Sequence, residues 1–110
     1  MRGAYKKFVD SLEEYPILGV TFPTHYGYII GYESEDGHDL DIFLGSGNTH
    51  GAIRVNRGDV PGGIETKIIL CVTEAEFEQI RKAYQEVIYE LKAMSEDEIM
   101  IYIEHFKANK

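Results

Sequence analysis

The residues best suited to chemistry are acidic side chains gathered in one short segment, HYGYIIGYESEDGHDLDIF, which spans residues 25–43. Asp36 belongs to a turn-forming Asp-Gly pair, and Asp39 and Asp41 follow it two residues apart. Residues two apart on a strand project from the same face, and Asp36 can fold back across the turn towards them. Carboxylates this close repel one another unless a positive group holds them together. The segment therefore predicts either a site for a hard cation such as Mg²⁺ or Mn²⁺, or a solvated acidic hairpin.

The composition describes a single acidic domain covering residues 1–110, with 44% hydrophobic residues. Nineteen acidic residues against 11 basic ones give a net charge of -8, which argues against partners such as nucleic acid or an anionic membrane. The single cysteine, Cys71, excludes an internal disulfide and indicates a reducing compartment. No stretch approaches the roughly 20 apolar residues of a membrane span, and no signal peptide is evident. We therefore expect a cytoplasmic protein.

The sequence predicts several consecutive strands followed by helices. Pro16 ends an amphipathic helical pattern over residues 3–15. Glycine-punctuated apolar stretches then predict five strands, at residues 17–22, 26–33, 39–44, 52–55 and 65–72.

Two capping boxes open the helical part of the chain. Thr73 and Glu76 precede an apolar stripe that reaches Leu91, and Ser95 and Glu98 precede a second stripe. Short consecutive strands followed by helices favour a mainly β fold with some α, namely a small five-stranded antiparallel barrel packed by two C-terminal helices, plus a short N-terminal helix.

A wider stretch, FPTHYGYIIGYESEDGHDLDIFL, resembles the soluble inorganic pyrophosphatases, whose signature joins a Tyr-Gly-Tyr/Phe strand to an Asp-Gly-Asp-Pro-x-Asp turn. If Tyr26 is aligned with the family's active-site tyrosine, Asp36 and Asp41 align with the first and last aspartates of the signature. Downstream, ETKIILCV looks like the family's Asp-x-Lys strand, which implies that Glu65 binds metal and Lys67 binds phosphate.

Two weaker matches extend the resemblance over residues 18–106. Asp59, in NRGDVPGG, matches a further metal-binding aspartate after a one-residue insertion, and IYIEHF is similar to the family's last helix. The resemblance implies an OB-like five-stranded barrel with helices, in agreement with the strand and helix pattern.

The family hydrolyses pyrophosphate with several Mg²⁺ ions, which hold the substrate and generate the hydroxide that attacks phosphorus in line. The resemblance therefore implies an inorganic diphosphatase acting on pyrophosphate or another small phosphoanhydride. Bacterial family members form hexamers, which leaves a homo-oligomer open. The implied catalytic residues are Tyr26, His38, Asp41 and Lys67, and the implied metal ligands are Asp36, Asp39, Asp41, Asp59 and Glu65.

The sequence departs from the family where the middle signature aspartate is His38 and the following proline is Asp39. His38 can act as the base, or can bind metal and shift the preference towards Mn²⁺ or Zn²⁺. Alternatively it is an exposed turn residue, with Asp39 supplying the carboxylate, which we favour.

The family's phosphate-binding lysine and arginine upstream, and its Tyr-Lys pair in the last helix, also lack counterparts here. A second hypothesis is therefore a catalytically inactive module that binds metal, a ligand or a protein. A third is a structural domain whose acids keep its surface soluble.

Overall fold

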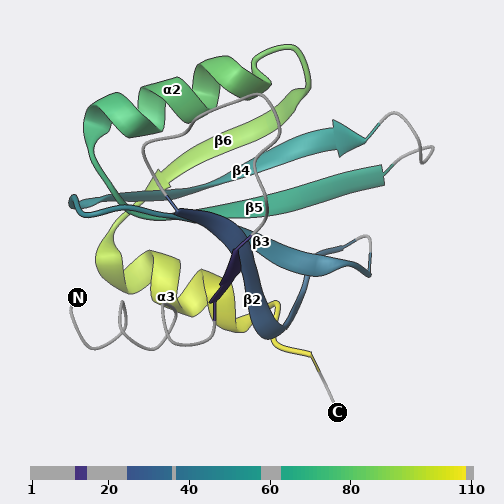
Figure 1. Cartoon of the computed structure of the whole chain (residues 1–110). Helices are drawn as coiled ribbons and strands as arrows, with labels where there is room; N and C mark the ends of the chain where they lie inside the picture. The colour runs from purple at the N-terminus through teal and green to yellow at the C-terminus, as the bar shows by residue number, and fades with distance from the viewer. Residues whose placement is uncertain (1–11, 15–24, 36, 58–62, 109–110) are drawn as a thin grey trace.

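The computed structural model describes residues 12–14, 25–35, 37–57 and 63–108. Within these ranges the chain forms six strands and two helices (Figure 1). In chain order they are β1 (Leu12–Glu14), β2 (His25–Glu33), β3 (Asp39–Leu44), β4 (Thr49–Arg57), β5 (Gly63–Val72), α2 (Glu74–Tyr84), β6 (Ile88–Met94) and α3 (Glu96–Glu104).

The described strands form one open mixed sheet in the order β1-β2-β3-β5-β4-β6. β3 and β5 pair in parallel, and every other neighbouring pair is antiparallel. The predicted closed antiparallel barrel is therefore wrong. Closure requires the two edge strands to pair with each other, but β1 and β6 lie at opposite edges of the sheet.

The N-terminal helix predicted over residues 3–15 is wrong where the structure describes it. Leu12–Glu14 form strand β1, which pairs antiparallel with β2 and sets Leu12 opposite Ile29. Pairing with the edge of a sheet supplies backbone hydrogen bonds that outweigh a weak helical pattern. The rest of that predicted helix, and the strand predicted at residues 17–22, lie outside the described residues.

The long helix predicted after Thr73 is divided into a helix and a strand. The capping box is confirmed, since the Thr73 hydroxyl accepts from the Glu76 N–H and the Glu76 carboxylate accepts from the Thr73 N–H. α2 nevertheless ends at Tyr84, and β6 then pairs with β4. The segment IYELKAM contains residues that suit a strand, and the free edge of β4 decides in favour of strand.

The second capping box is also confirmed. The Ser95 hydroxyl accepts from the Glu98 N–H at 3.2 Å and the Glu98 carboxylate accepts from the Ser95 N–H at 3.0 Å. α3 therefore begins where the sequence predicts.

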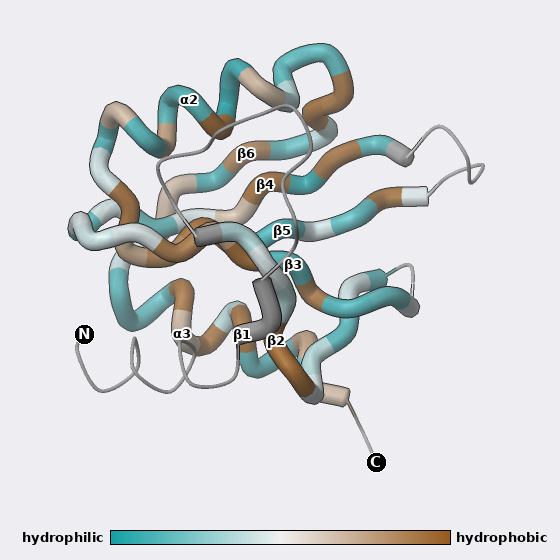
Figure 2. Tube along the Cα trace, in the orientation of Figure 1, coloured by the Kyte–Doolittle hydropathy of each residue, from teal (hydrophilic) through white to brown (hydrophobic). Residues whose placement is uncertain are grey.

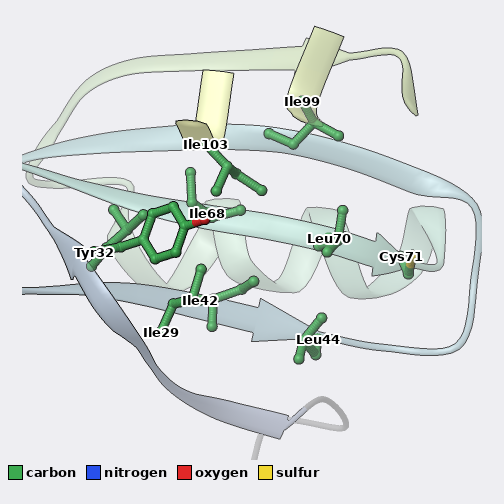
Figure 3. Packing of buried hydrophobic residues seen from close by; sticks show 10 residues of the cluster. Ile29, Tyr32, Ile42, Leu44, Ile68, Leu70, Cys71, Ile99 and Ile103 are labelled. Atoms are coloured by element: carbon green, nitrogen blue, oxygen red, sulfur yellow. The ribbon is translucent and has the colours of Figure 1, made fainter. Parts of the chain in front are cut away.

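Two apolar cores lie on opposite faces of the sheet, because successive side chains of a strand point to opposite sides. On the α3 face, even-numbered residues of β3 and β5 pack against Ile99 and Ile103 of α3 (Figure 3). On the α2 face, odd-numbered residues such as Phe43 and Ile69 pack against Ile80 of α2. The hydrophobic colours of Figure 2 follow the strands, while much of α2 is hydrophilic. Within the described residues, no helix has the length and apolar character needed to cross a membrane.

Candidate functional site

Four of the residues singled out in the sequence meet on the α2 face of the sheet. Tyr26 comes from β2, Asp41 from β3, and Glu65 and Lys67 from β5. Asp41 and Lys67 are direct partners in the parallel pairing of β3 with β5. Glu65 stands two residues before Lys67, so both side chains point to the same face. Strand alternation and register therefore bring these four side chains together.

The Lys67 ammonium is the centre of this group. Its Nζ donates to Tyr26 Oη at 2.7 Å, to Asp41 Oδ2 at 2.7 Å and to Glu65 Oε1 at 3.2 Å. Tyr26 Oη in turn donates to Asp41 Oδ2 at 3.0 Å. An ammonium has three N–H donors, so all three have an oxygen partner here. Lys67, Asp41 and Glu65 are buried, and the ion pairs they form are shielded from water.

Tyr84, the last residue of α2, completes the group, which we call the Lys67 cluster (Tyr26, Asp41, Glu65, Lys67 and Tyr84). The Lys67 Nζ lies 5.3 Å from the centre of the Tyr26 ring and 5.7 Å from that of Tyr84, both within the range of cation–π attraction. Tyr84 and Tyr26 also share a side-chain hydrogen bond. Sequence reasoning missed Tyr84 in this role, because its spacing indicates only the apolar stripe of a helix.

Phe43 fixes the orientation of the two tyrosines. Its ring centre lies 4.5 Å from that of Tyr26 and 6.3 Å, edge-on, from that of Tyr84. Aromatic pairs at these separations attract one another beyond the area they bury. The cluster is therefore held by apolar packing on one side and by hydrogen bonds on the other.

The pKa values in the cluster follow from burial and contact. Burial disfavours a charged Lys67, but its contacts with Tyr26 and Asp41 outweigh that effect and raise its pKa. Burial, followed by a hydrogen bond with Asp41, raises the pKa of Glu65. Burial likewise raises the pKa values of Tyr26 and Tyr84. At neutral pH the cluster therefore combines a permanent cation, two carboxyl groups of which Glu65 has a raised pKa, and two neutral phenols.

Of the remaining predicted site residues, the structure describes two. His38 and Asp39 are exposed, and Asp39 begins β3 opposite Glu33. Asp36 and Asp59 lie outside the described residues. The exposure of His38 agrees with its interpretation as a turn residue.

The donor set of the described residues does not fit a divalent cation. Nowhere in this part of the chain do three or more His, Cys, Asp or Glu side chains gather closely enough to hold one. Asp41 and Glu65 provide two carboxylates, and the Lys67 ammonium contacts both. Within the described residues, the positive group that holds these acids together is thus a lysine of the chain itself.

A second polar group anchors the turn that follows β2. The Thr66 N–H donates to Ser34 Oγ at 3.0 Å, and Thr66 Oγ1 donates to Glu35 Oε2 at 2.9 Å. Arg54 pairs with Glu35 at 3.2 Å. Burial opposes the charge on Glu35, but these hydrogen bonds lower its pKa. The start of the acidic turn is thereby tied to β5, the strand that carries Glu65 and Lys67.

Gly37 lets the turn close. Its φ of +81° lies in the left-handed region that glycine adopts without strain. Its N–H donates to the Ser34 carbonyl at 3.0 Å, and the Ser34 N–H donates to the His38 carbonyl at 2.8 Å. Gly37 therefore has the turn-forming role that the sequence indicates.

Comparisons of the chain with protein-family models, with curated proteins and with solved structures found no match.

Proposed function

We propose that this protein hydrolyses pyrophosphate or a similar small phosphoanhydride, which it receives as a complex with a divalent cation. The observation that supports this proposal is the meeting of Tyr26, Asp41, Glu65 and Lys67 in one hydrogen-bonded group. The pyrophosphatase resemblance assigned these four residues to one site, although Tyr26 and Lys67 are separated by 41 positions in the chain. Solubility alone gives no reason for acids to be buried around a lysine.

The cation in this proposal is Mg²⁺, with Mn²⁺ or Zn²⁺ as alternatives. Pyrophosphate is highly anionic, and the chain carries a net charge of -8, so the bare anion would be repelled. Neutralisation by a cation before binding removes that repulsion. Asp36, Asp39 and Asp59 are retained as proposed carboxylate contacts of the substrate-bound cation.

Each member of the cluster has a role in this reaction. Lys67 exchanges its longest contact, the 3.2 Å one to Glu65, for a phosphate oxygen and neutralises charge there. Tyr26 turns its O–H from Asp41 Oδ2 to a second phosphate oxygen.

The two carboxyl groups, those of Asp41 and Glu65, carry out the proton transfers. Asp41 accepts a proton from the attacking water as its oxygen bonds to phosphorus and the bridging P–O bond breaks. Glu65, with its raised pKa, gives a proton to the departing phosphate. One water and one pyrophosphate become two phosphates, and the pair returns to its starting state by passing a proton between its members.

A second candidate function, a non-catalytic module that binds a cation, a ligand or a protein, is favoured by one specific observation. All three Lys67 N–H groups already have partners within the chain. A cluster that is complete without a substrate can serve as a structural element beneath a binding surface.

The test is phosphate release from pyrophosphate with Mg²⁺, Mn²⁺ or Zn²⁺, measured for the unmodified chain and for Asp41→Asn. We expect cation-dependent turnover that Asp41→Asn abolishes while the circular dichroism spectrum stays unchanged. Asp97→Asn, the same change at an exposed site on α3, is the matched control and should keep full activity.

The same samples separate the alternatives. No turnover with any of the three cations contradicts the hydrolase proposal. A rise in melting temperature on adding cation or pyrophosphate, without turnover, supports the binding module. If neither turnover nor a thermal shift is observed, the hypothesis of a structural domain remains.

A further inference from the structure

Strand β6 is an edge of the sheet within the described residues. It pairs with β4 on one side, and no described strand pairs with its other side. An open edge presents backbone N–H and C=O groups that pair readily with a further strand. β6 is therefore a candidate surface for association, and this argument is independent of the proposed function.

The sequence of β6 is complementary to itself in the antiparallel direction. If two copies pair about a two-fold axis through Leu91, Glu90 of each copy lies opposite Lys92 of the other. Tyr89 is the extra residue of the irregularity in β6, since Arg54 of β4 pairs with Glu90 and Val55 pairs with Ile88, so the complementarity rests on Glu90 and Lys92. Residues directly opposite in an antiparallel pair point to the same face, so each match is a direct contact. One axis thus gives two opposite-charge pairs.

The side chains that this pairing needs are exposed. Glu90 and Lys92 both face solvent. Glu90 is held on the sheet by Arg54, whose Nη1 lies 3.9 Å from its Oε1, and the Glu90 side chain remains 55% exposed. Both side chains are therefore accessible to a second copy of the chain.

The backbone near the proposed axis is regular. From Glu90 to Met94, β6 keeps an unbroken register with β4, and the irregularity lies before Glu90. α2 packs chiefly over β4 and β5 on one face of the sheet. The outer edge of β6 at Leu91 is thus straight, a condition for adding a strand.

We propose that two copies of this chain associate through antiparallel pairing of their β6 strands about Leu91, so that the two sheets become one continuous sheet. The partner is a second copy because the Glu90–Lys92 match arises from β6 itself.

The first experiment reverses the charges and measures the dimer dissociation constant by sedimentation equilibrium. Glu90→Lys places two lysines opposite each other at both symmetric positions, and we expect dimerisation to weaken about tenfold or more. The double variant Glu90→Lys/Lys92→Glu restores both pairs with their signs exchanged and should recover most of the affinity. Glu86→Lys makes the same charge change outside the strand and should leave the dimer unchanged.

The second experiment tests the register. In the double variant Glu90→Cys/Lys92→Cys, the two cysteines of one copy lie opposite those of the other, so mild oxidation should give a covalent dimer. Neither single variant should do so, because Cys71 is buried. The proposal is wrong if the unmodified chain is monomeric. It is also wrong if Glu90→Lys leaves the dimer dissociation constant unchanged. Equal crosslinking of single and double variants overturns the register.

Discussion

The two faces of the sheet are built by alternate residues of the same strands, yet they differ in kind. On the α3 face, β5 contributes Ile68 and Leu70 to an apolar core (Figure 3). On the α2 face, the same strand contributes Glu65 and Lys67 to a buried ionic cluster before Ile69 returns to apolar packing. A shift of one residue in register would exchange these two environments. The α3 face therefore buries apolar side chains, while the α2 face combines its own apolar core with buried charges, which cost stability.

That difference identifies where function is to be sought. Removing charged groups from water is costly, and replacing a buried ion pair by apolar residues often stabilises a protein. A chain this small gains little from burying a lysine and two carboxylates for stability alone. The Lys67 cluster is therefore the part of the described structure on which the proposed function rests.

The largest expected effect is that of Lys67→Met, which leaves Asp41 and Glu65 buried without their cation. We expect the free energy of unfolding to fall by about 4 kcal/mol, measured by urea denaturation. The triple variant Lys67→Met/Asp41→Asn/Glu65→Gln removes the charges together and should recover most of the loss. If Lys67→Met costs no more than Lys82→Met, at an exposed site on α2, the contrast between the faces is wrong.

Ile68→Ala tests the apolar face next. Ile68 is fully buried, so the truncation leaves a cavity and should lower the free energy of unfolding by about 3 kcal/mol in the same urea measurement. Ile101→Ala, at a side chain that is 65% exposed, is the control and should change it little. Equal effects of these two variants would mean that the α3 face is not a packed core.

His50 gives the α3 face a predicted pH dependence. The Cys71 N–H donates to His50 Nδ1 at 2.9 Å, which requires a neutral ring. Burial lowers the pKa of His50 below its ordinary 6.5, against an opposing effect of Glu96. The unfolded chain then binds the proton more readily, so stability is complete above pH 6.5 and falls as the pH drops towards the lowered pKa.

The expected loss from protonating His50 is about 1.5 kcal/mol, because the buried Cys71 N–H loses its acceptor. Urea denaturation at a series of pH values measures it. His50→Gln should flatten the slope below pH 6.5, whereas His105→Gln, at an exposed histidine, should leave the slope intact. If His50→Gln leaves the slope of stability against pH unchanged, other groups cause the pH dependence.

The smallest effects come from the two helix caps, one on each face. Ser95→Ala and Thr73→Ala each remove the hydroxyl that accepts from a first-turn N–H, and each should cost about 1 kcal/mol. Ser95→Thr keeps the hydroxyl and should cost less in thermal or urea unfolding. A cost several times larger for one cap than for the other would show that the two helices depend unequally on their starts.

Local patterns in the sequence were sufficient for the elements whose cause is local. The capping boxes at Thr73 and Ser95 marked the starts of both helices. The strands predicted at residues 26–33, 39–44 and 65–72 correspond to β2, β3 and β5.

Part of the candidate site could also be read from the sequence. Glu65 and Lys67 share a face because they are two apart on a strand, and the family resemblance singled out Tyr26 and Asp41 with them. Their convergence follows from strand register. The resemblance implied a metal between the carboxylates, whereas the described structure places the Lys67 ammonium there.

Only the tertiary structure decided the features that depend on a distant partner. Residues 88–94 became β6 because the edge of β4 was free to pair, and Leu12–Glu14 became β1 because β2 offered the other edge. Tyr84 joined the cluster only when α2 packed on the sheet. A one-dimensional pattern records local conformational preference, but backbone pairing and burial depend on contacts between segments far apart in the chain, and here those contacts determined the outcome.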